Sequence, residues 1–232
     1  MQIQGLQKLT LLDFPGKVAC TVFCGGCNFR CPFCHNASLV LHSDEYEPVS
    51  ESEFFSLLKK RRGVLDGVCV TGGEPLLQPD LAEFLGKIHA AGYAVKLDTN
   101  GSMPETLAPL LQSGLVDFVA MDIKNSRERY AETIGVPGFS TEKVEESVRL
   151  LMNGQIPYEF RTTVVQELHH EEDFRRIGAW ISGAQRYFLQ QFRDSGGLIS
   201  QGLHACTKQQ MEHFRLEVMP FVPGVQLRGI DE

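Results

Sequence analysis

The 232-residue sequence lacks several features that define common classes of protein. No run of apolar residues reaches the roughly 18 that a membrane-spanning helix needs, so we expect no membrane partner. Basic residues are outnumbered, because 22 Lys and Arg side chains stand against 29 Asp and Glu and leave a net charge of −7. A protein that binds nucleic acid mainly through the phosphates presents a basic surface, so we also expect no nucleic-acid partner.

Targeting signals and repeats are also missing. Residues 1–10 lack the positively charged and then apolar segments of a secretory signal, so we expect a cytoplasmic protein. No fixed-period repeat, low-complexity tract or long block of charge divides the chain. We therefore predict one domain over residues 1–232, with a core over about 11–193 and a C-terminal extension over 194–232.

The seven cysteines are unevenly distributed, because four of them lie in the stretch from Cys24 to Cys34. A secreted protein held by disulfides is usually smaller, and its cysteines are spread through the fold. Thiols that cluster in a reducing compartment are more typical of metal ligands. We therefore expect a metal site in this stretch.

Short apolar segments alternate with segments of helical periodicity. The apolar segments are rich in β-branched or aromatic residues, which is typical of strands. The predicted strands are 18–23, 68–71, 94–98, 118–122, 159–165 and 187–192. Helices are predicted between them, and one begins at a capping-box pattern formed by Ser50 and Glu53. This alternation implies a parallel sheet, either an open doubly wound sheet or a partial barrel.

Polar residues gather at the C-terminal ends of the predicted strands. The cysteines follow the first strand, Gly72-Gly73-Glu74 the second, Asp98-Thr99-Asn100 the third and Asp122-Ile123-Lys124 the fourth. Gln190-Gln191 lies in the last strand. Ligands of parallel α/β folds bind at this edge of the sheet, so we expect a single site there.

Cys27, Cys31 and Cys34 form the pattern C-x3-C-x2-C, which lets a loop wrap a cluster with three thiolates. Three thiolates leave one iron of a cluster open to a substrate, whereas four close it. Cys24 with Cys27, and Cys31 with Cys34, also form two C-x-x-C pairs that would suit a structural zinc or a redox dithiol. The pairs of a structural zinc site usually stand much farther apart, so we favour iron–sulfur.

The cysteine stretch resembles a known family. C-x3-C-x2-C with Phe33 before the last cysteine is similar to the signature of the radical S-adenosylmethionine (SAM) superfamily. More narrowly, residues 12–17 (LDFPGK) and 26–36 (GCNFRCPFCHN) resemble activating enzymes of glycyl radical enzymes, above all activators of anaerobic ribonucleoside-triphosphate reductase. The likeness extends from about Leu11 to Phe192. With the strand pattern it predicts an α/β fold, a partial (β/α)6 TIM-type barrel of parallel strands.

The resemblance implies a [4Fe–4S] cluster on Cys27, Cys31 and Cys34, whose fourth iron takes the amino and carboxylate groups of SAM. Reduction would then release a 5′-deoxyadenosyl radical that removes a hydrogen atom from the target. No catalytic residue is implied beyond the cluster ligands. The other residues implied at the cofactor are Phe33, His35, Asn36, Gly72, Gly73, Glu74, Asp98, Asn100, Asp122, Lys124 and Arg161. Some such activators also place a monovalent cation beside the aspartates that match Asp98 and Asp122.

Each of these motifs has an ordinary structural alternative. Residues 72–74 would hold the methionyl amino group, or form only a tight turn. Residues 98–100 would lie at the cofactor rim, or form an Asx turn. Asp122 and Lys124 would reach the ribose and carboxylate, or form a surface ion pair. Arg161 would bind a carboxylate or hydroxyl group, or pair with a neighbouring acid.

The implied activity is that of an anaerobic oxidoreductase that installs a glycyl radical on a partner such as anaerobic ribonucleoside-triphosphate reductase. An electron donor such as flavodoxin or ferredoxin would be a second partner. One alternative is a radical SAM enzyme that acts on a small molecule or peptide, such as a deazapurine-forming synthase. Another is a non-catalytic iron–sulfur or zinc-binding protein.

The remaining cysteines and histidines are predicted to have structural roles. Cys20 and Cys69 lie in apolar strands and are expected in the core. Cys24 departs from the family pattern, and it would be inert or would compete for iron. Four histidines share no metal-ligand spacing and are expected in solvent or at helix ends: His169, His170, His204 and His213.

Overall fold

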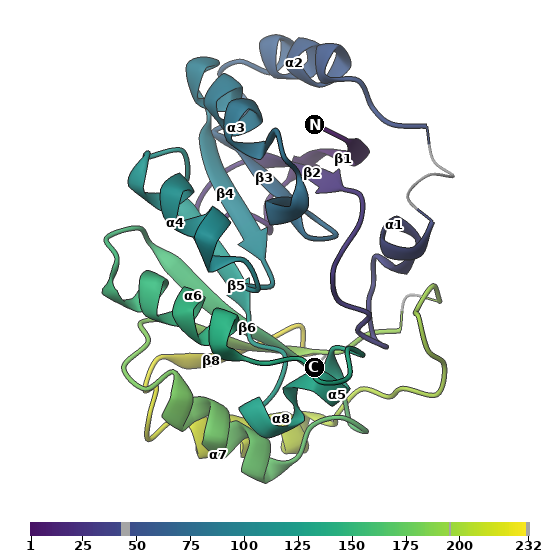
Figure 1. The fold of residues 1–232 in the computed structure, drawn as a ribbon, viewed down its shortest axis with the longest axis vertical. Helices are drawn as coiled ribbons and strands as arrows, with labels where there is room; N and C mark the ends of the chain where they lie inside the picture. The colour runs from purple at the N-terminus through teal and green to yellow at the C-terminus, as the bar shows by residue number, and fades with distance from the viewer. Residues whose placement is uncertain (43–46, 195, 231–232) are drawn as a thin grey trace.

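The structure is a computed structural model, and it describes residues 1–42, 47–194 and 196–230 (Figure 1). Within these ranges one eight-stranded sheet runs from β1 to β8. β1 is antiparallel to β2, whereas the pairs from β2 to β8 are all parallel. The strands are β1 (Ile3–Thr10), β2 (Ala19–Cys24), β3 (Gly67–Gly72), β4 (Ala94–Thr99), β5 (Phe118–Asp122), β6 (Tyr158–Val164), β7 (Tyr187–Gln191) and β8 (Val225–Arg228).

The strand order decides between the two predicted architectures. A doubly wound sheet reverses its order at a switch point, whereas a barrel adds each new strand on the same side. The order here is sequential from β1 to β8, so the predicted partial TIM-type barrel is confirmed. β1 and β8 are the two edges of the described sheet, and the barrel is open between them.

The six predicted strands correspond to β2–β7, and their ends differ from the prediction by no more than one residue. The sequence does not predict the two edge strands. The exposed half of β1 carries Gln7 and Lys8, and β8 has only 4 residues, so neither has a clear apolar pattern. β8 lies in the predicted C-terminal extension and pairs with β7. The division of the chain into a core and an extension stays a prediction.

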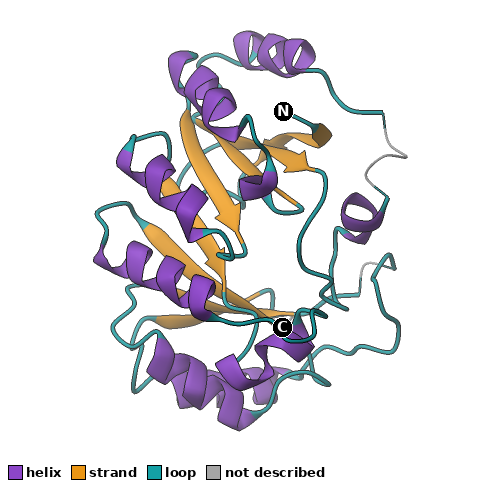
Figure 2. Ribbon diagram, viewed as in Figure 1, coloured by secondary structure: helices purple, strands orange, loops and turns teal. Residues whose placement is uncertain are grey.

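Helices connect the strands and cover the outer side of the sheet (Figure 2). The predicted capping box of α2 is confirmed, because Ser50 Oγ accepts from Glu53 N and Glu53 Oε2 accepts from Ser50 N, both at 3.2 Å. None of the helices in the described part of the chain has the length and apolar character needed to cross a bilayer. The helices are α1 (Ala37–Leu41), α2 (Glu51–Lys60), α3 (Leu81–Ala90), α4 (Pro104–Gln112), α5 (Tyr130–Thr133), α6 (Glu142–Asn153), α7 (Glu171–Trp180) and α8 (Lys208–Val218), with 3-10 turns η2 (Pro75–Leu77) and η3 (Arg127–Arg129).

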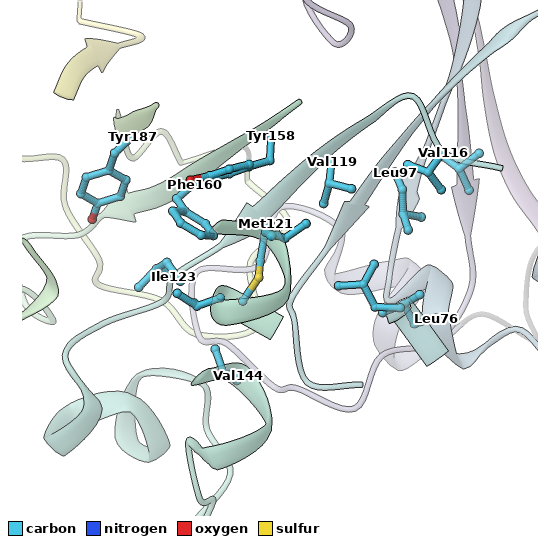
Figure 3. Close-up of a cluster of buried hydrophobic side chains, with 14 of the residues drawn as sticks. Leu76, Leu97, Val116, Val119, Met121, Ile123, Val144, Tyr158, Phe160 and Tyr187 are labelled. Atoms are coloured by element: carbon cyan, nitrogen blue, oxygen red, sulfur yellow. The ribbon is translucent and has the colours of Figure 1, made fainter. Parts of the chain in front are cut away.

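The main apolar core lies between the outer face of the sheet and the helices. Leu97 of β4, Met121 of β5 and Phe160 of β6 are fully buried there (Figure 3). Because side chains alternate between the two faces of a strand, the residues between these point into the barrel. On β4 the inward residues are Lys96 and Asp98, which pair with each other. The barrel interior is therefore charged where most such barrels are filled by apolar side chains.

A small second apolar cluster closes the other end of the barrel. Phe14 packs against Phe118 with 6.2 Å between ring centroids, beside Ala19 and Ala94. Ala19, Ala94 and Phe118 are the first residues of β2, β4 and β5. Phe14 belongs to the LDFPGK segment, so in this fold that segment seals the barrel at the end opposite the polar edge.

Candidate active site

A cavity opens at the C-terminal ends of the parallel strands, the edge at which the sequence predicts a ligand site. Its walls come from the loop after β2 (residues 25–36, the cysteine loop) and from the ends of β3 to β7. The residues predicted for the site all line this cavity: Cys27, Cys31, Phe33, Cys34, His35, Asn36, Gly72, Gly73, Glu74, Asp98, Asn100, Asp122, Lys124 and Arg161. The fold thus brings these positions together, and the role of each one stays a prediction.

The cysteine loop packs against the segment around α5, which supports it. Arg30 N donates to Ile134 O at 2.8 Å. The ring of Phe29 packs edge-on against Tyr130 and Phe139, with centroid distances of 6.4 and 5.2 Å. Aromatic pairs of this geometry add to the stabilisation from burial. The loop is therefore held by residues more than a hundred positions away in the chain.

Contact with the cavity, rather than burial, separates the four clustered cysteines into two kinds, because Cys31 is buried as Cys24 is. Cys27, Cys31 and Cys34 line the cavity, and none of the described cysteines forms a disulfide. Cys24 ends β2, is fully buried and does not line the cavity. Burial raises the pKa of the Cys24 thiol to about 12, and it raises that of Cys31 to the same value, so the pKa does not distinguish the two. Cys24 and Cys20 belong to the apolar core. Cys69 is also fully buried, as predicted, but its Sγ lies inside the barrel, 3.7 Å from Asp98 Oδ1.

The thiols at the cavity fit an iron–sulfur cluster that keeps one iron open. Soft thiolates select such clusters, and three of them leave one iron free for another ligand. A zinc site built from the two C-x-x-C pairs would need a fourth thiol at the wall, and Cys24 lies in the core instead. The donor set therefore matches the cluster implied by the sequence better than it matches a structural zinc.

The turn after β3 needs its glycines because it lies against the cysteine loop. Gly72 has φ +116°, and a Cβ at Gly73 would stand 1.8 Å from Gly26 O. Gly73 N donates to Cys24 O at 2.9 Å, and Glu74 N donates to Gly26 O at 2.8 Å. No side chain fits at Gly73 without moving the backbone of the cysteine loop.

The carboxylate of Glu74 joins the ends of β3 and β4. Its Oε1 accepts from Leu76 N at 3.1 Å and from Thr99 Oγ1 at 2.8 Å, and its Oε2 accepts from Asn100 N at 2.7 Å. Burial raises the pKa of Glu74 to about 7, and the three donors act in the opposite direction. Glu74 also lines the cavity, where the predicted contact with an amino group would be made.

Asn100 connects β4 to the first cluster cysteine. Its Nδ2 donates to Asn28 Oδ1 at 2.9 Å and lies 3.9 Å from Cys27 Sγ. Its Oδ1 accepts from Ser102 N at 2.9 Å, and Asn28 Nδ2 donates to Ser102 Oγ at 2.7 Å. Side chains that hydrogen-bond around a cluster ligand orient it and tune its metal. Asn100 therefore lines the cavity and braces the cysteine loop, and its place at the cofactor rim stays a prediction.

Five charges of alternating sign run along the wall of the barrel, and we call this row the charge ladder. Its members are Lys96, Asp98, Arg161, Asp122 and Lys124. Burial opposes the charged form of Asp98 and Asp122, but the neighbouring cations outweigh this effect. The pKa of both carboxyl groups is therefore lowered, and that of Asp122 falls to about 2. For Lys124 and Arg161, the aspartates outweigh the opposing effect of burial and raise the pKa.

Phe33 and His169 pack beside the end of the ladder. Lys124 Nζ lies 5.9 Å from the centroid of the Phe33 ring. The ring of His169 meets Phe33 edge-on at 6.5 Å, and its Nε2 is 2.8 Å from Lys124 O. The prediction that His169 is solvated or capping is wrong, because its exposed fraction is 2%. His169 is a buried support of the cavity wall, and no local pattern separates it from the exposed His204 and His213.

The far side of the cysteine loop contacts the segment after β7. His35 stacks on Phe192 at 5.7 Å, and its Nε2 lies 2.7 Å from Arg193 O. Asn36 Nδ2 donates to Gly72 O at 2.9 Å, which ties the loop to the glycine turn. His35 and Asn36 thus shape the loop and line the cavity at the same time.

Some residues of the site are not predicted by the sequence. Asn28 and Ser102 complete the network around Asn100, and Thr99 holds Glu74. Their polar side chains adjoin predicted motif positions, which is the only local signal for them. Tyr130 supports the loop from far along the chain, and only the tertiary fold shows that contact.

The fold and the cavity first define a class of protein. A parallel barrel with three thiols and a row of charges at one mouth is suited to an enzyme that holds a metal cluster beside an organic ligand.

The comparison with protein families identifies that class. A family model described as "Radical SAM superfamily" matches residues 21–181, which is more than half of the chain. The chain belongs to the radical SAM superfamily, and it is an enzyme that uses a [4Fe–4S] cluster and SAM.

Individual proteins extend this comparison. A Methanocaldococcus jannaschii protein named "Putative glycyl-radical enzyme activating enzyme MJ1227" is 31% identical over 82% of this chain and 79% of that protein. A "Probable GTP 3',8-cyclase" of Thermococcus kodakarensis is 33% identical over 63% of this chain, which spans about half (47%) of that protein. The crystal structure of a domain of pyruvate-formate lyase-activating enzyme from Bacteroides vulgatus aligns with a TM-score of 0.58 and 18% identity, covering 70% of this chain and 99% of that domain. The last likeness bears on the fold alone.

Proposed function

We propose that this enzyme installs a glycyl radical on a partner protein, with anaerobic ribonucleoside-triphosphate reductase as the leading candidate. The observation that carries the proposal is the similarity to the Methanocaldococcus jannaschii protein, because it extends over most of both chains. The resemblance of the LDFPGK and cysteine-loop segments to activators of that reductase supports the finer choice of partner. The gap between β1 and β8 also leaves the barrel open at the side, which suits a macromolecular substrate.

In this proposal Cys27, Cys31 and Cys34 hold the cluster, and flavodoxin or ferredoxin supplies the electron. When bound, the cluster and SAM supply a 5′-deoxyadenosyl radical that takes a hydrogen atom from the target glycine. Lys124 and Arg161 would orient the carboxylate and ribose of SAM, because their charges stand at the cavity wall. Orientation and exclusion of water are the contributions of the protein, and the cofactor supplies the radical chemistry.

The test is anaerobic reconstitution with iron and sulfide, followed by reduction in the presence of SAM. We expect 5′-deoxyadenosine and, with an anaerobic reductase chain added, the electron spin resonance doublet of a glycyl radical. Cys31→Ala should lose the cluster, whereas Cys24→Ala should keep iron near the wild-type content because Cys24 lies in the core. Equal iron loss in both variants would contradict the ligand assignment. Formation of 5′-deoxyadenosine without a radical on the reductase chain would contradict anaerobic ribonucleoside-triphosphate reductase as the target.

A second candidate is a radical SAM enzyme with a small-molecule substrate. The similarity to a GTP 3',8-cyclase favours it, although this chain spans about half of that protein. Incubation of the reduced, SAM-loaded enzyme with GTP separates the candidates. We expect GTP to be recovered unchanged, and its SAM-dependent conversion would favour the second candidate.

A further inference from the structure

The two aspartates of the charge ladder have a cationic partner on each carboxylate oxygen. Asp98 Oδ1 contacts Lys96 Nζ, and Asp98 Oδ2 accepts from Arg161 Nη1 at 3.0 Å. Asp122 Oδ1 accepts from Arg161 Nε at 2.9 Å, and Asp122 Oδ2 accepts from Lys124 Nζ at 2.9 Å. As far as the structure describes the chain, all four oxygens are thus engaged by this protein's own cations.

Arg161 reaches both aspartates because of the strand register. On β6 it is the direct neighbour of Asp122 on β5. Asp98 on β4 is paired instead with Ala120, two residues before Asp122. Residues two apart on a strand share a face, so the small side chain of Ala120 leaves the inward space between the aspartates to the guanidinium.

The charge of this wall disfavours a further cation. The ladder carries three positive and two negative charges, and the exposed fractions of Asp98 and Arg161 are both 14%. A metal ion between Asp98 and Asp122 would have to displace the guanidinium and would then lie beside its positive charge. Repulsion between like charges is strong where water is largely excluded. The arrangement does not fit the cation site that the resemblance implies.

We propose that the guanidinium of Arg161 takes the place between Asp98 and Asp122 that a monovalent cation takes in some glycyl radical activators, so that SAM binding by this chain is independent of Na⁺ and K⁺. A guanidinium suits this position because it stays charged at all working pH values and presents donors in a fixed plane toward two carboxylates. The part of the inference that concerns SAM rests on the proposed use of this cavity.

The first test measures the affinity of the reconstituted wild-type protein for SAM by equilibrium dialysis. The salts are KCl, NaCl and choline chloride at equal ionic strength, so that general screening is constant. We expect dissociation constants that agree within about two-fold, a difference too small to indicate a specific ion site. An affinity that rises about ten-fold or more in K⁺ or Na⁺ would overturn the inference.

The second test uses the protein without cluster or SAM and measures the midpoint of thermal unfolding, Tm. The wild type should have the same Tm in KCl and choline chloride. Arg161→Ala leaves two facing carboxylates, so K⁺ should bind there and raise the Tm of this variant by about 4 °C relative to choline. Arg176→Ala is the matched control, because Arg176 is an exposed arginine that also pairs with two carboxylates.

The two tests separate the possible failures. If no salt supports SAM binding, the proposed cofactor site is wrong, and the Tm comparison still decides the inference about Arg161. Equal responses of Arg161→Ala and Arg176→Ala to K⁺ would overturn the inference. If Arg161→Ala does not fold, Arg161→Met replaces it, because the methionine side chain fills part of the same space without a positive charge. A K⁺-dependent Tm of the wild type would overturn the inference without any variant.

Discussion

Asp98 and Asp122 are carboxylates at the ends of neighbouring strands, and the cations around them decide their state at the cavity. Both are ionised because Arg161 stands between them and a lysine lies on the outer side of each. All three residues carry a carboxyl group, so the residue type alone does not show that Glu74 has a raised pKa while the two aspartates have lowered ones. The carboxylate of Glu74 is surrounded by neutral donors, and burial raises its pKa to about 7. Charge at the cavity is therefore set by neighbours two residues away in the chain and by Arg161 on β6.

The pairing of Asp122 makes a testable contribution to acid stability. Its pKa falls from 3.8 in the unfolded chain to about 2 in the fold, so the native carboxylate binds fewer protons within this range. The stabilisation is present above about pH 4 and is lost as the pH falls toward 2, and the shift corresponds to about 2 kcal/mol. Denaturant unfolding of the cluster-free wild type and of Asp122→Asn should show their stability difference shrinking by that amount. A difference that is constant with pH would contradict this account.

Among the secondary-structure elements, β2–β7 can be predicted because each is a short segment rich in β-branched or aromatic residues, and most of them end at a polar or cysteine motif. The edge strands β1 and β8 cannot be predicted in this way. β1 is partly exposed and needs apolar residues on one side only, and β8 has 4 residues, too few for a clear pattern. The short α5 also lacks a local signal, although it supports the cysteine loop through Tyr130. Local periodicity thus predicts the elements that have two neighbours in the sheet.

The candidate site is predicted to a similar extent and for a related reason. Parallel strands bring their C-terminal ends to one edge, so motifs at Cys27, Gly73, Asp98 and Asp122 had to meet there once the sheet was parallel. The partners of these motifs are less accessible to sequence reasoning. The contact between Lys96 and Asp98 needs only the alternation of a strand, whereas the reach of Arg161 to Asp98 depends on the register of three strands.

Two glycines after α5 test how this segment supports the cysteine loop. Gly135 has φ +66°, and a Cβ there would stand 2.4 Å from Arg30 O. Gly138 has φ +75° and no atom within 4 Å of such a Cβ. Both changes to Ala carry the cost of a left-handed residue, on the order of 1 kcal/mol, but only Gly135→Ala also pushes the cysteine loop. We expect Gly135→Ala to lower the iron content after reconstitution and Gly138→Ala to keep it. Equal iron content in the two variants would show that the loop does not depend on this contact.

At the scale of the whole molecule, the two ends of the barrel have different tasks. The end of the barrel at which the parallel strands finish carries the cavity, the thiols and the charge ladder. The opposite end is closed by Phe14 against Phe118, and Asp13 accepts a hydrogen bond from Thr21 at 2.5 Å beside it. Phe14 of the segment that helped to indicate the family therefore lies at the starts of the strands, whereas Cys27, Cys31 and Cys34 lie at the opposite edge of the sheet.

That separation predicts a change that weakens the fold and leaves the site intact. Phe14 is 2% exposed, so Phe14→Ala removes a buried ring from a small cluster and should lower the free energy of unfolding by about 3 kcal/mol. Leu12→Ala is the control, because Leu12 is 89% exposed two residues away and should change stability by less than about 0.5 kcal/mol. Denaturant unfolding of the cluster-free proteins measures both. Iron bound per folded molecule should be the same in both variants and the wild type. A loss of iron in Phe14→Ala at temperatures where it is fully folded would mean that the two ends of the barrel are coupled.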